Sequence, residues 1–205
     1  MKRLLLVLAL AGLLGCAKAS EPEPQESASK ESLKEKVLFV IAPINFRDEE
    51  LSVPKRILSE AGFETIIASK DTATARGMLG AKIKPDISLS SVNSGDYKAL
   101  VIVGGSGATV LWNDTTLIRI VKEFFAAKKA TGAICLAPVV LARAGILSGA
   151  DATCFESVKP ELMKYGARYL SQDVVVSGWI VTGSGPAAAQ EFAHRLLELI
   201  KEQDG

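Results

Sequence analysis

Uninterrupted apolar runs that alternate with amphipathic segments constrain the fold of this chain more than any other feature. Residues 37–42 read VLFVIA and residues 100–103 read LVIV, with no polar residue in either run. Strands of this composition are buried on both faces, which is typical of parallel sheets covered by helices on both sides. Amphipathic segments follow the runs, among them one over residues 114–129. The alternation predicts an α/β fold: a three-layer sandwich with a mostly parallel sheet and helices on both faces.

Residues 1–15 are predicted to be a signal peptide and no part of the fold. Lys2 and Arg3 precede an apolar stretch that is too short to span a bilayer comfortably. The sequence LLGC, which ends at Cys16, resembles the lipobox of bacterial lipoproteins and implies cleavage before Cys16 and acylation of that residue. The alternative is an ordinary secretory signal. With the lipobox, we expect an exported, membrane-anchored lipoprotein on the periplasmic or cell-surface side, with the lipid bilayer as a partner.

Residues 16–36 are predicted to be a flexible tether, and residues 37–205 to be one folded domain. The tether is rich in Glu, Pro, Ser, Lys and Ala and has almost no apolar side chain to bury. The domain is long enough for a sizeable core, and no second domain is indicated. Loss of Lys2 and Arg3 leaves 22 basic residues against 23 acidic ones, a balance of −1. A nearly neutral chain gives no reason to expect nucleic acid as a partner.

A short stretch around Cys135 is the best candidate for chemistry. Residues 131–134 are predicted to be a buried strand that runs almost directly into a helix after Cys135. A sharp strand-to-helix turn exposes its corner side chain, and the free N–H groups of a helix start stabilise negative charge there. We therefore expect the Cys135 thiol to ionise more easily than a free thiol. The alternative is a small, buried side chain without a chemical role, as many cysteines are.

Several polar and glycine positions fall at the same edge of the predicted sheet as Cys135. Glu49 and Glu50 follow the first strand, and Gly104 and Gly105 follow the central one. Ligands of open parallel sheets bind at this carboxyl edge. The glycines do not complete G-x-G-x-x-G, so no dinucleotide cofactor is expected; they allow a close approach of backbone N–H groups, as in an oxyanion hole. No metal site is expected, because one histidine and dispersed cysteines lack ligand spacing.

Motifs spread over residues 37–201 resemble the DJ-1/PfpI (ThiJ) superfamily of flavodoxin-like domains. Their order and spacing cover nearly the whole predicted domain. They are FRDEEL with Pro54, the AG pair at 61–62, YKALVIVGG at 97–105, AIC at 133–135 with Pro138, AGIL at 144–147 and TGSGP at 182–186. The resemblance implies a flavodoxin-like fold with a cysteine at the strand-to-helix elbow. It also implies a homodimer, because dimers are common among relatives.

The resemblance gives roles to several residues at the carboxyl edge. It implies that Cys135 is the reactive cysteine and that Glu50 is the acid that hydrogen-bonds its sulfur. Because two adjacent anions would repel, we expect Glu50 to be protonated and to donate to a thiolate or a sulfinate oxygen. Gly104, Gly105 and the N–H of Leu136 would form a small anion pocket. By itself, Glu50 would be an ordinary acidic residue in a first helical turn.

Two departures from the family pattern weigh against a cysteine protease. The proposed proteases of the family have a histidine directly after the cysteine, where this chain has Leu136. The DJ-1 branch has a histidine further along, where this chain has Phe155. The only histidine, His194, lies on the polar side of the last predicted helix and is expected to be exposed. A Cys–His dyad is therefore not available within one chain.

Three functional interpretations remain open. In the first, Cys135 adds to a small reactive carbonyl such as methylglyoxal and Glu50 moves the proton, a cofactor-independent glyoxalase- or deglycase-type reaction implied by the resemblance and weakened by the missing histidine. The alternative is a non-enzymatic redox-sensing or stress-protective module in which peroxide oxidises Cys135. A third is a family member that keeps only the fold and uses its surface for assembly. Cys154, predicted in a short strand, is either a resolving thiol for Cys135 or a core residue.

Overall fold

The computed structural model describes residues 34–203. The predicted signal peptide, the lipidation site Cys16 and most of the predicted tether lie outside the described residues. Within residues 34–203, no helix has the length and apolar character needed to cross a membrane.

A seven-stranded sheet forms the centre of the domain. Its strands are β1 (Lys36–Val40), β3 (Glu64–Ser69), β6 (Ile87–Ser88), β7 (Ala99–Ile102), β8 (Ala130–Ile134), β11 (Val174–Ser177) and β12 (Ile180–Gly183). They lie in the order β11-β12-β8-β7-β1-β3-β6, and every neighbouring pair is parallel except β11 with β12. Five of them, β3-β1-β7-β8-β12, follow the flavodoxin-like order 2-1-3-4-5. The predicted mostly parallel sheet is confirmed.

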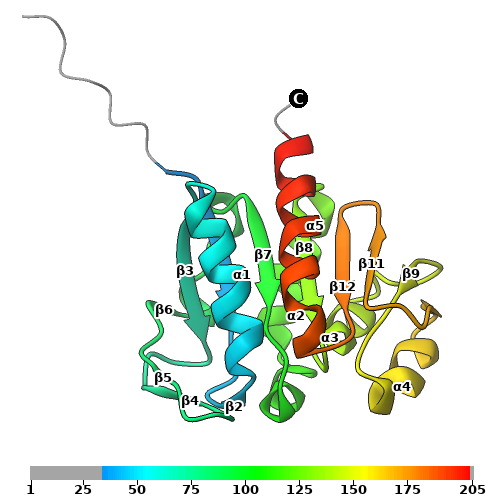
Figure 1. Ribbon diagram of the computed structural model, residues 1–205, viewed down its shortest axis with the longest axis horizontal. Coiled ribbons are helices and arrows are strands. Elements are labelled where there is room, and N and C mark those ends of the chain that lie inside the picture. Colours follow the sequence, from blue (N-terminus) through cyan, green and yellow to red (C-terminus); the bar gives the residue numbers. More distant parts are fainter. Residues whose placement is uncertain (1–33, 204–205) are drawn as a thin grey trace, which may run out of the picture. The chain divides into compact units, whose positions relative to one another are not determined.

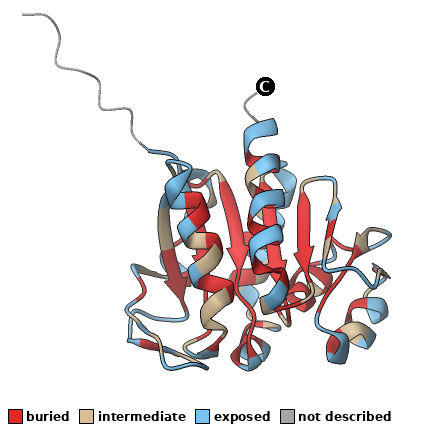
Figure 2. Ribbon diagram, viewed as in Figure 1, coloured by how far each residue is buried: buried red, intermediate tan, exposed pale blue. Residues whose placement is uncertain are grey.

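Helices cover both faces of this sheet, which completes the predicted three layers (Figure 1). One face carries α1 (Asp48–Glu60) and α5 (Ala189–Glu202); the other carries α2 (Thr115–Ala126) and α3 (Pro138–Arg143). Alternate residues of β1 supply the two cores: Val37 and Phe39 pack in the cluster on the α5 side, Leu38 and Val40 in the cluster on the α2 side. Figure 2 shows the central strands buried along their length.

The remaining elements are short and lie at the margins of the sheet. They are β2 (Ile44–Phe46), β4 (Ala75–Gly77), β5 (Lys82–Ile83), β9 (Asp151–Ala152), β10 (Arg168–Tyr169), α4 (Lys159–Lys164) and the 3-10 turns η1 (Leu89–Ser91), η2 (Ser94–Asp96), η3 (Ser106–Leu111), η4 (Glu156–Val158) and η5 (Pro186–Ala188). The prediction of a strand at Cys154 is wrong: β9 ends at Ala152, and Cys154 lies in the segment that leads to η4. This segment leaves β9 after two residues because it must reach the elbow, where its backbone donates a hydrogen bond.

The register of the sheet brings the candidate site residues to one edge. Val40 pairs with Ile102, and Ile102 pairs with Ala133, so β1, β7 and β8 end side by side. The chain after β1 leads to Glu50 in α1, the chain after β7 forms the glycine loop, and Cys135 directly follows β8. Parallel strands therefore collect, at the point where the strand order changes direction, residues that are far apart in the sequence.

Candidate active site

Cys135 lies in a strained turn directly after β8. Its φ is +63°, a left-handed conformation that is costly for a residue with a side chain. The Ala137 N–H donates to the Ile134 carbonyl at 3.1 Å and closes the turn, and α3 begins only at Pro138. The sharp elbow predicted from the sequence is confirmed. Strain of this kind persists where the surrounding structure holds it, as at many functional sites.

Glu50 is completely buried in the first turn of α1, at 0% exposure. Its Oε2 accepts the N–H of Gly104 at 3.0 Å. Burial raises the pKa of this carboxyl to about 7, although interaction with the Cys135 thiol and with the Gly104 N–H lowers it. The other oxygen, Oε1, has no well-directed hydrogen-bond partner among the described residues. The Cys135 thiol, which interacts with this carboxyl, is the side chain nearest to serving as a partner for Oε1.

Glu49 does not share this environment. Its side chain is partly exposed and pairs with Arg47, whose Nε lies 2.8 Å from Glu49 Oε2. Of the two adjacent acids, Glu50 is thus the one that meets Cys135, as expected. Arg47 was missed from the sequence, yet its charge lowers the pKa of Glu50. The only signal for Arg47 in the sequence was its position three residues before Glu50, which places the two residues about one helical turn apart.

The Cys135 thiol is harder to ionise than a free thiol, which corrects the expectation from the sequence. Burial, with only 6% of the residue exposed, raises its pKa to about 12, and the charge of Glu50 raises it as well. The N–H groups of Gly105 and Leu136 act in the opposite direction. The prediction failed because desolvation of a thiolate outweighs two backbone donors, and because the start of α3 lies three residues away.

The protonation states of the two groups follow from this order of pKa values. Above pH 7 the site holds a Glu50 carboxylate beside a neutral Cys135 thiol. This is the reverse of the expectation from the sequence, which was a protonated Glu50 beside a thiolate. The two groups titrate as a pair, so removal of the thiol proton to Glu50 leaves the net charge of the site unchanged.

The glycine loop after β7 allows these groups to meet. A Cβ on Gly104 would lie 2.5 Å from Glu50 Oε2 and 2.6 Å from the Cβ of Cys135, so no other residue fits without displacement. Gly105 has φ +93°, and a Cβ there would lie 2.5 Å from the Arg47 N. The predicted pocket of three N–H donors therefore has two donors for the sulfur instead of three. The Gly104 N–H is taken by Glu50, and those of Gly105 and Leu136 act on the sulfur.

Cys154 lies next to the elbow through its backbone. The N–H of Phe155 donates to the Cys135 carbonyl at 2.9 Å, and both cysteines are free and buried. Burial raises the pKa of Cys154 to about 12, and the charge of Cys135 also contributes. A depression of about 750 Å³ lies beside Cys154 and not beside Cys135; it is lined by Cys154, Phe155, Glu156, Tyr169, Ser171, Gln172, Asp173, Val174, Ser184, Gly185, Pro186, Ala187 and Glu191.

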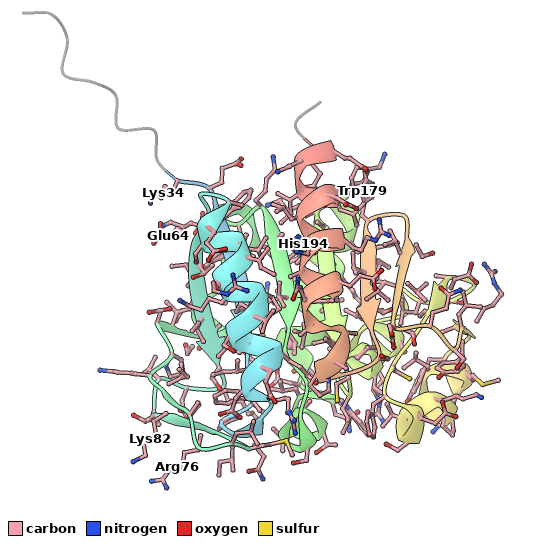
Figure 3. The ribbon with its side chains drawn as sticks, viewed as in Figure 1. Lys34, Glu64, Arg76, Lys82, Trp179 and His194 are labelled. Carbon is pink, nitrogen blue, oxygen red and sulfur yellow. The ribbon has the colours of Figure 1, made fainter. Side chains whose placement is uncertain are left out.

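The single histidine takes no part in this site. His194 is exposed on α5, as predicted, and lies in the middle part of that helix (Figure 3). Phe155, at the position where the resemblance implies a histidine in the DJ-1 branch, is 46% exposed. In the described part of the chain, no group of three or more His, Cys, Asp or Glu side chains could hold a metal ion.

Comparison with curated proteins finds relatives over most or all of the chain. The protein MJ0967 of Methanocaldococcus jannaschii is 41% identical over 208 residues, which cover 100% of both chains. The deglycase PH1704 of Pyrococcus horikoshii is 31% identical over 81% of this chain and 99% of its own. The glutathione-independent glyoxalase DJR-1.2 of Caenorhabditis elegans is 29% identical over 80% of this chain and 88% of its own.

Comparison with solved structures and family models agrees with these relatives. A ThiJ/PfpI domain protein of Brachyspira murdochii superimposes with a TM-score of 0.80 at 33% identity, covering 82% of this chain and 98% of its own. The model of the DJ-1/PfpI family matches residues 35–199, which include the elbow, the glycine loop and the buried acid. This chain therefore belongs to the DJ-1/PfpI family.

Proposed function

We propose that Cys135 and Glu50 convert small reactive carbonyls without a cofactor, in a glyoxalase- or deglycase-type reaction. The observation that carries the proposal is the fully buried Glu50 carboxyl, held by Gly104 beside the Cys135 thiol. A pKa of about 7 makes this carboxyl a proton acceptor and a proton donor near neutral pH. Two relatives are named deglycase and glyoxalase, which supports the substrate class.

For an α-oxoaldehyde, the reaction begins as sulfur adds to the aldehyde carbon. The π bond of the carbonyl breaks, and Glu50 takes the thiol proton and passes it to the former carbonyl oxygen, so a hemithioacetal forms. The Gly105 and Leu136 N–H groups stabilise the negative charge that develops in this step. Because Glu50 can thus supply the base for Cys135, the step needs no histidine.

Glu50, again a carboxylate, then removes the hydrogen of the former aldehyde carbon. The electron pair passes to the neighbouring carbon through an enediol, and a proton is added there, which gives a hydroxyacyl thioester. Water cleaves the carbon–sulfur bond and releases the hydroxy acid and the Cys135 thiol. One carbon is oxidised as its neighbour is reduced, so the balance requires water alone.

The test is turnover of methylglyoxal, with detection of lactate, by the reduced protein and by its Cys135→Ser variant. We expect lactate from the first protein and none above background from the second. A Glu50→Gln variant, which keeps the size of the side chain, should also be inactive. Absence of product from the unaltered protein would refute the proposal.

A redox-sensing role is the second candidate, because the sulfur has two N–H groups and an acid around it. Glu50 would take the thiol proton as the sulfur attacks one peroxide oxygen; the O–O bond breaks, the other oxygen takes that proton and leaves as water, and a sulfenic acid remains. A second peroxide would oxidise the sulfenic acid in the same way to a sulfinic acid, which ionises to the sulfinate. The N–H groups of Gly105 and Leu136 suit sulfinate oxygens. Mass spectrometry after peroxide treatment tests this role: oxidation confined to Cys135 favours it, and a disulfide with Cys154 would make Cys154 the resolving thiol.

We also propose that the protein is an exported lipoprotein, anchored to the bilayer through acylated Cys16. The LLGC motif supports this. Expression in a bacterial host with a labelled fatty acid tests it: label should enter the unaltered chain and be lost in Cys16→Ser. Unlabelled protein in both cases would favour an ordinary secretory signal.

A homodimer is a further proposal, supported by exposed apolar side chains around β2 and β4. Ile44 and Leu79 are each 62% exposed there. Light scattering after size exclusion tests it, because a monomer mass at micromolar concentration would contradict it.

A further inference from the structure

Three backbone hydrogen bonds hold the turn around Cys135. The Cys135 N–H donates to the Gly183 carbonyl at 2.9 Å, and the Cys135 carbonyl accepts the N–H of Phe155 at 2.9 Å. The Ala137 N–H donates to the Ile134 carbonyl at 3.1 Å. These bonds tie the turn to β12, to the segment after β9 and to itself. All three are made by backbone groups alone.

The carbonyl of Leu136 is held in a different way, by a side chain from another segment. The indole Nε1–H of Trp112 donates to it at 3.0 Å. Trp112 follows η3, in the connection between β7 and α2, and its ring is half-buried against the core. Among the hydrogen bonds of residues 34–203, this is the only one that a side chain donates to a carbonyl of residues 135–137.

The orientation of the indole is itself held by a cation. The guanidinium carbon of Arg143 lies 5.4 Å from the centre of the Trp112 ring, within the range of a cation–π contact. Arg143 is the last residue of α3, and its guanidinium also binds Glu161 at 3.0 Å and the side chain of Asn113. The helix that follows the elbow thus fixes the ring that binds the elbow.

We propose that Trp112 is a positioning residue for Cys135. The Trp112 indole N–H holds Leu136 so that the Leu136 N–H faces the Cys135 sulfur. The Leu136 N–H shares a peptide plane with the Cys135 carbonyl, which Phe155 binds, and the Leu136 carbonyl shares the next plane with the Ala137 N–H, which binds Ile134. Trp112 therefore fixes the second plane, so that Leu136 is held on both sides and its N–H keeps its direction. A left-handed Cys135 needs such external anchors, because its own backbone preference works against it. The inference rests on the proposed function only in that Cys135 is the reactive group.

The test compares alkylation of Cys135 in Trp112→Phe and in the unaltered full-length protein. Phenylalanine keeps an aromatic ring for Arg143 to stack on but has no N–H to donate. We follow iodoacetamide labelling of the Cys135 peptide by mass spectrometry against pH. With the Leu136 carbonyl released, labelling should slow roughly five- to tenfold at neutral pH, the loss expected for one hydrogen bond.

The pH profile separates positioning from a merely structural role. The titratable and charged groups that act on Cys135 are Glu50, Arg47 and Cys154, and the variant leaves all three in place. Loss of one N–H donor to the sulfur should move the profile to higher pH. A profile that superimposes on that of the unaltered protein would overturn the inference, whatever the melting temperature of the variant.

Trp179→Phe is the matched control. Trp179 is the other tryptophan, half-buried directly before β12 and at the end of the sheet away from the elbow (Figure 3). The chemical change is the same, and labelling of Cys135 should be normal. Equal slowing in both variants would count against the inference. Labelling also needs no turnover, so a protein inactive toward carbonyls would refute the proposed function and still test the role of Trp112.

Discussion

Cys135 and Cys154 are two buried free thiols whose pKa values are both raised to about 12, chiefly by burial. They differ in what surrounds the sulfur. Cys135 lies beside the Glu50 carboxyl and two backbone N–H groups, whereas the influences on Cys154 are the charges of Glu156, Cys135 and Lys159. Burial alone yields an unreactive thiol. The comparison teaches that two similarly buried thiols can differ in their neighbours, and under the proposed function the acid and the N–H groups beside Cys135 are what makes that thiol reactive.

The largest expected difference between the two thiols is in turnover. Cys135→Ala should lower methylglyoxal turnover by about a thousandfold or more, because the nucleophile is lost. Cys154→Ala should leave most of the activity, since Cys154 has no proton acceptor of its own. Steady-state rates of both variants measure this, and equal loss in the two would break the comparison.

A glycine substitution near each thiol gives the next largest effect. Gly104→Ala places a methyl 2.5 Å from Glu50 Oε2 and 2.6 Å from the Cys135 Cβ, which must separate the acid from the sulfur. A displacement of about 1 Å can cost about a hundredfold in rate. Gly185→Ala, near Phe155 in the Cys154 region, places its methyl at an ordinary 3.6 Å from that ring and should be tolerated. Rates normalised to folded protein test the pair.

The pH dependence of stability sharpens the comparison through Glu50. Its pKa is raised from 4.5 in the unfolded chain to about 7 in the fold, so the folded state binds the proton more tightly. The stability contribution is fully present below pH 4.5 and is lost as pH rises to about 7. The loss is about 3 kcal/mol at most.

Denaturant unfolding at several pH values measures this loss. Glu50→Gln should flatten the dependence across that window, and Cys154→Ala should leave it as in the unaltered protein, because a thiol with a pKa of about 12 does not titrate there. An unchanged slope in Glu50→Gln would show that Glu50 is not the titrating group.

The smallest expected effect concerns the ion pair between Arg47 and Glu49, next to Glu50. The charge of Arg47 lowers the pKa of Glu50 and that of Glu49 raises it. Arg47→Met should therefore move the rising limb of the pH–rate profile to higher pH, and Glu49→Gln should move it to lower pH. Both shifts should stay below about one pH unit, since the pair is partly exposed. Shifts of the same sign would contradict this assignment.

Much of the fold was predictable because its signals are local. The apolar runs of β1 and β7 and the amphipathic pattern of α2 predicted the three layers, and the elbow after β8 was predicted from a short motif. The ends of elements were less predictable. Cys154 was assigned to a strand, yet the chain leaves β9 after Ala152 to bind the elbow. That contact joins the segment after Cys154 to the turn at Cys135, and no local sequence pattern indicates it.

The sequence by itself placed Cys135, Glu50 and the glycine loop at one edge of the sheet, because each follows a buried strand and parallel strands end at the same edge. The resemblance to the DJ-1/PfpI family, carried by motifs in the sequence, added that Glu50 meets Cys135. Only the tertiary structure decided how they behave. Burial reversed the expected ionisation of Cys135, the Gly104 N–H went to Glu50, and Trp112 came to hold the turn. The physical reason is that desolvation and hydrogen-bond direction depend on every atom packed around a group, and those atoms come from distant parts of the chain.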